Sequence, residues 1–139
     1  MLMHKVVINA DGASHGNPGP AAIGAAIRDE TGCLLASVSE RIGDTTNNQA
    51  EYRALIAALE KALSIGVRRA DIRLDSELVV RQLQGRYRVK NTGLRPLYLR
   101  AAELLGQLEG FSLTCVPREL NAEADRLANA AFTRGGGAP

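Results

Sequence analysis

The spacing of apolar residues changes near residue 50, and this change constrains the fold more than any other feature of the sequence. Before it, the segments 4–11, 21–29 and 33–42 have the length and apolar content of strands. After it, apolar side chains recur at helical spacing through about four turns, until Gly66 ends the pattern. These side chains are Tyr52, Leu55, Ile56, Leu59 and Leu63. Three strands that feed an amphipathic helix indicate a mixed α/β domain.

The rest of the sequence continues this alternation of strands and helices. Glycine and proline residues over 12–20 predict a turn, and residues 29–32 predict a hairpin. The segments predicted after the first helix are a short strand over 70–75, a short helix over 78–83, a basic loop over 85–93, a helix over 96–108, a strand over 111–116 and a final helix from Asn121. A strand reached through a helix can lie parallel to its neighbour. We therefore expect an antiparallel meander that feeds a parallel pair of strands.

The length of 139 residues suits one domain. We expect this domain to occupy residues 1–133, followed by a disordered glycine-rich tail over 134–139. No apolar run approaches the roughly 20 residues of a membrane span, and the chain enters its first strand too early for a signal peptide. Cys33 and Cys115 lack metal-ligand spacing. We interpret them as buried free thiols of a protein in the reducing cytoplasm.

The net charge of +2 is too small to indicate a nucleic-acid partner, but the charges are unevenly distributed. Between residues 81 and 100 the chain carries six basic residues and no acidic one. They are Arg81, Arg86, Arg88, Lys90, Arg95 and Arg100. Such a stretch can follow a phosphate backbone. A solvated helix face with its adjoining loop explains it equally well.

Four acidic residues occupy positions that an ordinary fold has little reason to make acidic. Asp11 and Asp75 end apolar strands, whereas Glu51 and Asp125 lie near the starts of amphipathic helices. Taken alone, Asp11 suits a turn, and Glu51 suits a capping box with Asn48. In the same way, Asp75 suits a helix cap, and Asp125 suits the first turns of a helix, where the macrodipole favours an acid.

Together, the four positions favour a shared site. The carboxyl ends of parallel strands meet at one edge of a sheet, where ligands bind in α/β proteins. Glu51 and Asp125 border the apolar faces of their helices, so both side chains can point toward that edge. Clustered carboxylates repel one another unless divalent cations neutralise them, and carboxylate oxygens suit Mg²⁺ or Mn²⁺. The arrangement predicts two-metal phosphoryl chemistry.

Around these acids the sequence resembles the ribonuclease H family, type 1, from residue 4 to residue 133. The matching stretches, in chain order, are Asp11-Gly12 with GNPGP over 16–20, TTNNQAE over 45–51, Asp75-Ser76 with VRQ over 80–82, and NAEADRLA over 121–128. The resemblance implies a ribonuclease H-like α/β fold. Its mixed five-stranded sheet has three antiparallel and two parallel strands, flanked by helices.

The resemblance also implies an endoribonuclease that hydrolyses the RNA strand of an RNA–DNA hybrid, leaving 5′-phosphate and 3′-hydroxyl ends. Its cofactors would be two Mg²⁺ ions, with Mn²⁺ as a possible substitute. One ion would prepare the attacking water, and the other would stabilise the leaving 3′ oxygen. The metal ligands carried over from the family are Asp11, Glu51, Asp75 and Asp125. The expected partner is the hybrid and not a membrane, and we expect the chain to act as a monomer.

Substrate contacts follow from other matched positions. In the family, the glycine-rich turn and the Asn-Asn pair contact the minor groove, where 2′-hydroxyls mark the RNA strand. The corresponding residues here are Ser14, Asn17, Asn47 and Asn48. Thr46 and Asn91 are candidates for a pocket that binds a phosphate of the DNA strand, and Gln82 is a further candidate for substrate binding.

The sequence departs from many family members in two places. Residues 83–98 are too few for the long basic helix and loop that grip the hybrid, although Arg86, Arg88 and Lys90 keep some charge. We therefore expect weaker hybrid binding. No histidine precedes the last acid within residues 115–121. Glu119, as a proton acceptor, and Arg118, as a phosphate ligand, are candidates to replace it, and solvated loop charges are the alternative explanation.

Two other functions fit parts of the same sequence. A binding module that keeps the fold and has lost turnover would bind hybrid without metal or cleavage, and the presence of all four acids argues against it. A junction resolvase or a 3′ exonuclease of the same superfamily would also use clustered acids. The Asn47-Asn48 pair and the turn over 16–20 favour hybrid recognition over these enzymes.

Overall fold

The structure is a computed structural model that describes residues 5–136. Its elements in chain order are β1 (Lys5–Ser14), β2 (Gly19–Asp29), β3 (Leu34–Thr45), α1 (Asn47–Ser64), β4 (Arg69–Leu74), α2 (Glu77–Leu83), α3 (Arg95–Leu105), β5 (Gly110–Cys115), the 3₁₀ turn η1 (Arg118–Asn121) and α4 (Ala122–Gly136). This order of strands and helices confirms the one predicted from the spacing of apolar residues.

The five strands form one mixed sheet in the order β3-β2-β1-β4-β5. β1 pairs antiparallel with β2, and β2 pairs antiparallel with β3. On its other side, β1 pairs parallel with β4, and β4 pairs parallel with β5. The predicted meander and parallel pair are therefore confirmed. Asp11 and Asp75 both follow the paired segment of β1 and β4, which ends at the partners Ala10 and Leu74.

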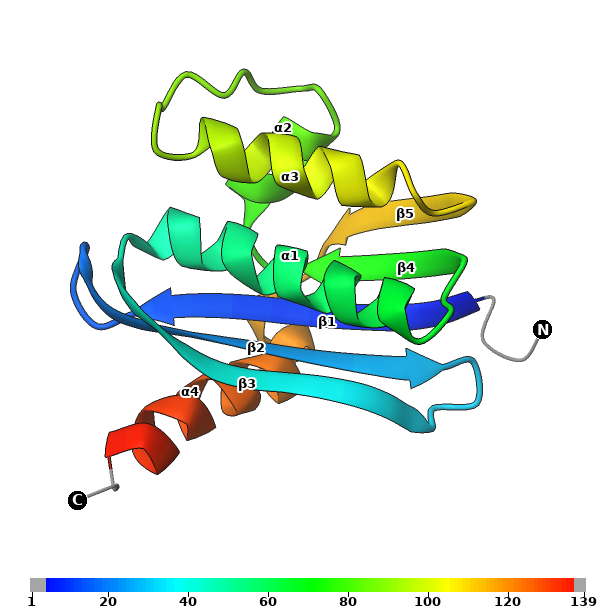
Figure 1. Cartoon of the computed structure of the whole chain (residues 1–139), viewed down its shortest axis with the longest axis horizontal. Helices are drawn as coiled ribbons and strands as arrows, with labels where there is room; N and C mark the ends of the chain where they lie inside the picture. Colours follow the sequence, from blue (N-terminus) through cyan, green and yellow to red (C-terminus); the bar gives the residue numbers. More distant parts are fainter. Residues whose placement is uncertain (1–4, 137–139) are drawn as a thin grey trace.

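Helices cover both faces of the sheet (Figure 1). α1 lies on one face with α3 packed beside it, and α4 crosses the opposite face over β2 and β3. The core lies mainly between the sheet and α1. Its largest fully buried side chains include Tyr52, Ile8, Ile27, Leu55, Leu59 and Ile72. Among the described residues, no helix is long and apolar enough to cross a membrane.

The caps of α1 and α2 leave two of the acids available for other contacts. Thr46 is the N-cap of α1, and it forms a capping box with Gln49, so the box is not formed by Asn48 and Glu51. Ser76, and not Asp75, caps α2 through a hydrogen bond to the backbone N–H of Val79. The ordinary explanations for Glu51 and Asp75 are therefore wrong, because neighbouring hydroxyl side chains already satisfy these helix ends.

Two glycines allow helices to lie directly on strand backbones. A Cβ added at Gly12 of β1 would lie 2.1 Å from the carbonyl oxygen of Ala50 in α1. A Cβ added at Gly24 of β2 would lie 2.3 Å from the carbonyl oxygen of Ala124 in α4. Only a residue without a side chain permits such a close approach. The two contacts hold α1 against β1, which carries Asp11, and α4 against the neighbouring strand β2.

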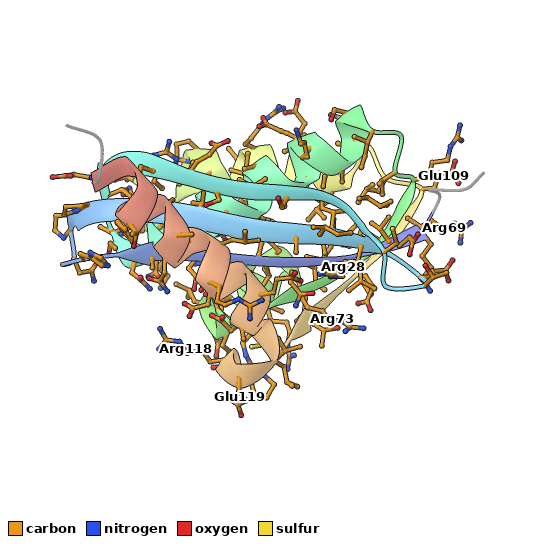
Figure 2. All side chains as sticks on the ribbon, turned by 90° about the horizontal axis from the view of Figure 1, so that it is seen from below. Arg28, Arg69, Arg73, Glu109, Arg118 and Glu119 are labelled. Atoms are coloured by element: carbon orange, nitrogen blue, oxygen red, sulfur yellow. The ribbon has the colours of Figure 1, made fainter. Side chains whose placement is uncertain are left out.

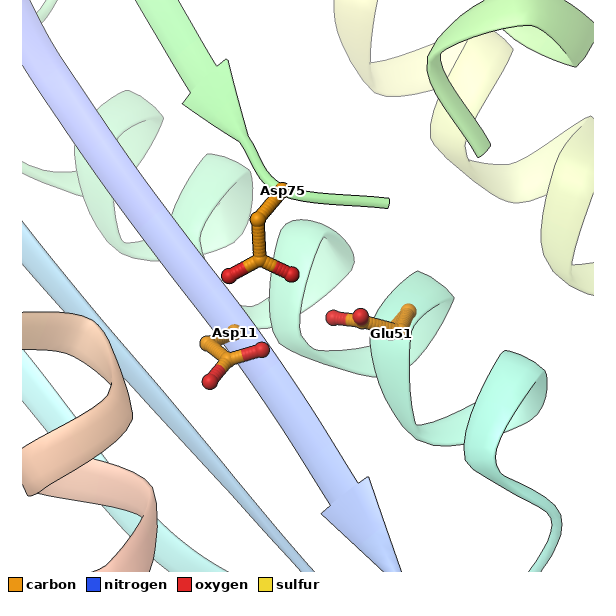
Figure 3. Close-up of side chains that lie close together, drawn as sticks. All are labelled: Asp11, Glu51 and Asp75. Carbon is orange, nitrogen blue, oxygen red and sulfur yellow. The ribbon is translucent and has the colours of Figure 1, made fainter. Parts of the chain in front are cut away.

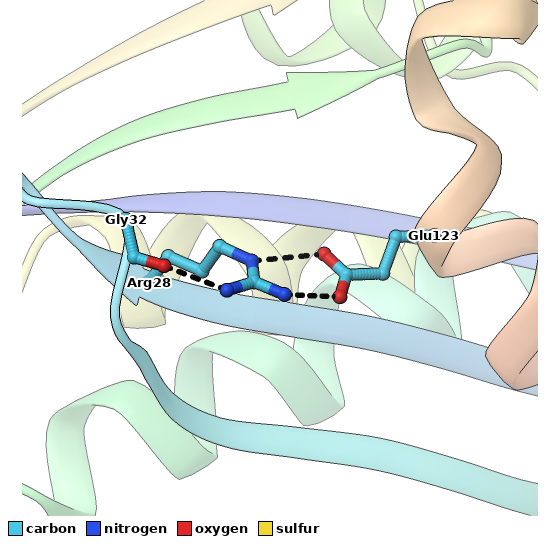
Figure 4. Close-up of polar contacts among 3 residues, drawn as sticks. All are labelled: Arg28, Gly32 and Glu123. Carbon is cyan, nitrogen blue, oxygen red and sulfur yellow. Dashed lines mark hydrogen bonds and ion pairs between the residues drawn. The ribbon is translucent and has the colours of Figure 1, made fainter.

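The N-terminal half of α4 is also tied to the sheet by polar contacts. Arg28 of β2 makes a two-pronged ion pair with Glu123, with N–O distances of 3.1 and 2.5 Å, and donates to the carbonyl oxygen of Gly32 (Figure 4). Further along the helix, the hydroxyl of Ser39 donates to the carbonyl oxygen of Leu127 at 2.6 Å. These contacts add to the packing that holds α4 on the sheet.

Some boundaries and environments differ from the prediction. The turn predicted over 12–20 is shorter, because pairing between β1 and β2 continues to Ser14 opposite Ala21. α4 runs to Gly136, so the predicted domain boundary at residue 133 falls inside its last turn, and residues 137–139 lie outside the described part of the chain.

The prediction that both cysteines are buried is wrong. Cys33 and Cys115 are free thiols, but both are exposed. Cys33 lies just before β3 in the hairpin that joins it to β2, and Cys115 ends β5, the short strand at the edge of the sheet. An apolar strand pattern does not distinguish a central strand from an edge strand, and the edge leaves these side chains open to solvent.

Candidate active site

Three carboxylates converge at the end of the parallel strand pair. Asp11 comes from β1, Asp75 follows the last residue of β4, and Glu51 reaches across from the first turns of α1 (Figure 3). Each residue offers an oxygen atom such that all three oxygens lie within 4.8 Å of one another. Asp11 is 5% exposed and Glu51 is 9% exposed, so these charges are held largely away from water. The predicted meeting of strand and helix acids is thus present for these three residues.

The site strongly favours protonation of two of these acids when no cation balances their charge. Burial and the negative charge of Asp75 raise the pKa of Asp11 to about 7. Burial and the charge of Asp11 raise the pKa of Glu51 to about 9, although the backbone N–H of Gly12 donates to Glu51 Oε1 at 2.9 Å and favours the ionised form. Buried like charges thus dominate the electrostatics of the site.

Asp125 approaches the cluster from the opposite face of the sheet. It lies in the first turn of α4, and a side-chain hydrogen bond with Asp125 contributes to the raised pKa of Asp11. The close contact between α4 and Gly24 brings Asp125 there, since Gly24 is the register partner of Asp11. The structure therefore brings Asp125, the fourth predicted acid, to Asp11. The tight group of three consists of Asp11, Glu51 and Asp75.

The chemistry of these donors fits a divalent cation. Hard cations such as Mg²⁺ and Mn²⁺ prefer carboxylate oxygens. A cation among Asp11, Glu51 and Asp75 would offset the repulsion that raises the first two pKa values. The residues present therefore suit a divalent metal ion.

Asn121 is a site residue that the sequence reasoning did not select. Its side chain is 1% exposed, and it ends η1 directly before α4. Its Nδ2 donates to the carbonyl oxygen of Ala10 at 2.9 Å and to Oδ2 of Asp75 at 2.9 Å. From the sequence, Asn121 has the residue type of a helix cap. The available signal was its spacing of four residues before Asp125, which can place two side chains on one helical face.

Three of the predicted minor-groove residues are joined by hydrogen bonds. The backbone N–H of Asn47 donates to Asn17 Oδ1 at 2.9 Å, and the N–H of Ser14 approaches Asn47 Oδ1 at 3.4 Å. The turn between β1 and β2 is thereby joined to the start of α1. Asn48 follows Asn47 on α1 and is exposed.

The two predicted phosphate-pocket residues are connected through Gln49. The backbone N–H of Gln49 donates to Thr46 Oγ1 at 3.2 Å, and its Nε2 donates to the carbonyl oxygen of Gly93 at 3.3 Å. Asn91 Oδ1 accepts from the N–H groups of Gly93 and Leu94. The loop before α3 is thus held at the start of α1, which brings the Thr46 and Asn91 segments together.

The other predicted residues lie in different surroundings. Gln82 is buried, where it accepts a hydrogen bond from the hydroxyl of Tyr52 at 2.6 Å and donates weakly to the carbonyl oxygen of Arg88. Arg118 and Glu119 are exposed on η1, and their side chains project away from the domain (Figure 2). The structure therefore does not bring these three residues into the acidic cluster.

The basic segment forms a concave surface between α2 and α3. A cavity of about 430 Å³ is lined in part by Tyr87, Arg88, Lys90 and Arg95. The guanidinium of Arg81 lies 5.5 Å from the centre of the Tyr87 ring, which is a cation–π distance. This surface concentrates positive charge next to an exposed aromatic ring, and such a combination suits a nucleic-acid strand.

Comparisons with known proteins agree with the fold. Residues 9–131 match the family described as "Reverse transcriptase-like". The Ribonuclease HI of Halobacterium salinarum is 49% identical over 122 residues, which cover 88% of this chain and 61% of that protein. The Bifunctional protein Rv2228c of Mycobacterium tuberculosis is 48% identical over 129 residues, which cover 92% of this chain and 35% of that protein.

Solved structures show the same relationship. The crystal structure of RNase H1 from Halobacterium salinarum superposes with a TM-score of 0.91 at 46% identity, covering 94% of this chain and 98% of that one. The N-terminal RNase H domain of Rv2228c gives a TM-score of 0.89 at 48% identity, covering 91% and 98%. The compost-derived LC11-RNase H1, in complex with an RNA/DNA hybrid, gives 0.88 at 42% identity, covering 94% and 98%.

The five-stranded mixed sheet of this chain is the fold of these solved ribonuclease H structures, and the relatives specify the family. The chain belongs to the ribonuclease H family, type 1, and its similar relatives are compact members of it. The chain spans 35% of the length of the first curated relatives that it matches.

Proposed function

We propose that the chain is an endoribonuclease that hydrolyses the RNA strand of RNA–DNA hybrids and leaves 5′-phosphate and 3′-hydroxyl ends. The observation that carries this proposal is the convergence of Asp11, Glu51 and Asp75 within 4.8 Å, with Asp125 beside Asp11. Family membership and the hybrid bound to LC11-RNase H1 support the choice of substrate. Residues 1–133 would form the catalytic domain.

In this proposal the four acids hold two Mg²⁺ ions, for which Mn²⁺ is a substitute. When bound, the ions supply charge stabilisation for both the attacking and the leaving oxygen of an in-line displacement. The chain contributes the geometry. Asp11 and Asp75 directly follow the last paired residues of β1 and β4, and Glu51 is held by the N–H of Gly12 at 2.9 Å. These anchors preorganise the carboxylates before the substrate arrives.

The groups that surround the acids would select the hybrid. Ser14, Asn17, Asn47 and Asn48 would contact the minor groove, where the 2′-hydroxyl distinguishes RNA from DNA. The hydrogen bonds that join Ser14, Asn17 and Asn47 support a common role for these three residues. Thr46 and Asn91 would bind a phosphate of the DNA strand, since Gln49 links their segments. Gln82 would also bind the substrate, through its buried side-chain amide.

Two exposed residues would serve in place of a loop histidine. Glu119 would accept a proton or assist release of product and metal, and Arg118 would contact a phosphate. Their position on η1, immediately before the helix that carries Asp125, supports this assignment. We further propose that the chain acts as a monomer in the cytoplasm, where its free and exposed thiols would remain reduced.

A cleavage assay tests this function. The substrate is an end-labelled RNA strand paired with DNA, incubated in Mg²⁺, in Mn²⁺ and in EDTA, with Asp75→Asn beside the wild type. We expect metal-dependent cutting that the variant loses, and products that a kinase cannot label at the 5′ end until a phosphatase has acted. Hybrid binding without cutting in either metal would replace the enzyme with a binding module. Cutting of branched DNA or of 3′ ends alone would indicate a resolvase or an exonuclease.

A further inference from the structure

Asn121 is linked to the segments that carry three of the four acids. Its amide donates to Asp75 and to the carbonyl oxygen of Ala10, the residue before Asp11. Asn121 itself lies four residues before Asp125, at the junction of η1 and α4. A single side chain that is 1% exposed therefore joins β1, the end of β4 and the start of α4.

The hydrogen bonds of Asn121 also determine which way its amide faces. Nδ2 has two hydrogens, and two acceptors lie 2.9 Å away. Oδ1 accepts from Nδ2 of Asn9 at 3.0 Å. In the flipped orientation, the oxygen would face a carbonyl oxygen and a carboxylate, and both contacts would be repulsive. The amide is therefore held in one orientation, with its donor directed at Asp75.

The chemistry of an amide suits this position better than the chemistry of other donors. Lysine or arginine would also donate to Asp75, but a positive charge would neutralise the carboxylate and weaken its attraction for a cation. An aliphatic side chain would fill the space without donating. The asparagine amide orients a carboxylate and adds no net charge at any ordinary pH.

We propose that Asn121 is a positioning residue that sets the geometry of the metal ligands. By binding Asp75 Oδ2, it fixes the rotation of that carboxylate and so the direction in which its oxygens face a cation. By binding the Ala10 carbonyl, it fixes the strand immediately before Asp11. This inference rests on the proposed function, in which the same acids bind divalent ions. Mutating a group that holds a metal ligand in this way typically lowers metal affinity or activity by about 10- to 100-fold. We expect an effect of this order of magnitude here.

The test compares Asn121→Ala with Ser39→Ala in the full chain. Ser39→Ala removes a hydrogen bond that also holds α4 to the sheet but does not touch the acids. Binding of Mn²⁺ alone is measured by titration calorimetry, and kcat and KM are measured on a hybrid. For Asn121→Ala we expect Mn²⁺ affinity and kcat to fall on the order of 10- to 100-fold, with KM for the hybrid unchanged within about twofold. Ser39→Ala should keep the wild-type Mn²⁺ affinity and kcat.

Two further variants make the result decisive. Asn121→Asp keeps the shape but sets an acceptor against Asp75, so kcat should fall at least as far as in Asn121→Ala. Asn9→Ala removes only the bond to Asn121 Oδ1 and should lower Mn²⁺ affinity in the same direction by less, which tests the proposal even if Asn121→Ala does not fold. Wild-type Mn²⁺ affinity in Asn121→Ala or, if that variant is unfolded, in Asn9→Ala would overturn the positioning role. A wild-type protein that binds Mn²⁺ but cuts no hybrid would instead overturn the proposed function.

Discussion

At Gly12 the backbone of β1 meets the backbone of α1, and this contact sets how far Glu51 lies from Asp11. The N–H of Gly12 donates to Glu51 Oε1, and a Cβ at this position would collide with the carbonyl oxygen of Ala50 at 2.1 Å. A backbone atom cannot rotate away as a flexible side chain can. The distance between strand and helix is therefore controlled by the absence of one methyl group.

Gly12→Ala should push α1 away from β1 and separate Glu51 from the other acids. Forced overpacking typically costs about 1–3 kcal/mol, and the displaced ligand should lower kcat further than this loss of stability explains. Gly110→Ala is the matched control, because a Cβ there meets nothing within 4 Å. Thermal unfolding and hybrid cleavage are measured for both. Equal activity in the two alanine variants would show that the close approach does not position Glu51.

At the scale of elements, α4 is held on the sheet by contacts of unequal strength. The Arg28–Glu123 pair is well aligned, but its side chains are 38% and 32% exposed, so water screens it. The contact at Gly24 is a direct approach of two backbones. Because exposed ion pairs contribute about 0–1 kcal/mol, packing at Gly24 should matter more than the ion pair for the position of Asp125.

This ranking can be tested by comparing Arg28→Ala with Gly24→Ala. Arg28→Ala should destabilise the protein only slightly, because water screens the ion pair, and should leave kcat close to wild type. Gly24→Ala should displace α4 and Asp125, lowering both the melting temperature and kcat clearly. Urea unfolding and steady-state cleavage provide the two measurements. A larger loss of kcat in Arg28→Ala would reverse the ranking.

The loop between α2 and α3 is the element that carries the basic charge. Lys90 is exposed beside a concave surface that also contains Arg88 and Arg95. If Lys90 neutralises one phosphate, Lys90→Ala should weaken hybrid binding for every sequence and reduce the slope of log affinity against log salt by about 1. Lys61→Ala, at an exposed position in the last turn of α1, is the control with the same change of charge. An identical salt slope in the two variants would place Lys90 outside the binding surface.

For the whole molecule, the sequence predicted the elements better than the surroundings of single residues. The change from strand to helix spacing near Glu51 predicted the order of elements, and the crossover after α1 predicted the parallel pair. The seven-residue helix α2 is too short for its spacing to show that Gln82 faces inward. The role of Asn121 arises only where β1, β4 and α4 meet, and such a meeting leaves no local signal in the chain.

The acidic cluster also makes the stability of the whole domain depend on pH and on metal. In the unfolded chain, Asp11 and Glu51 would lose their protons near the ordinary pKa values of 3.8 and 4.5, whereas in the fold the values are about 7 and 9. The folded state therefore holds more protons between these limits, and its free energy of unfolding should fall as pH rises through them. Divalent cations bind the ionised carboxylates of the folded state and should reverse this loss.

In EDTA, the melting temperature should therefore decrease from pH 5 to pH 9, by about 4 °C for each kcal/mol of electrostatic cost. Saturating Mg²⁺ should restore most of the loss at pH 9 and have little effect at pH 5, where Asp11 and Glu51 are largely protonated. Glu51→Gln should flatten the dependence on pH in EDTA, whereas Glu30→Gln, an exposed acid in the β2–β3 hairpin, should not change it. A melting temperature that stays constant or rises between pH 5 and pH 9 in EDTA would mean that the buried acids do not repel one another. The cluster would then need no cation for charge balance.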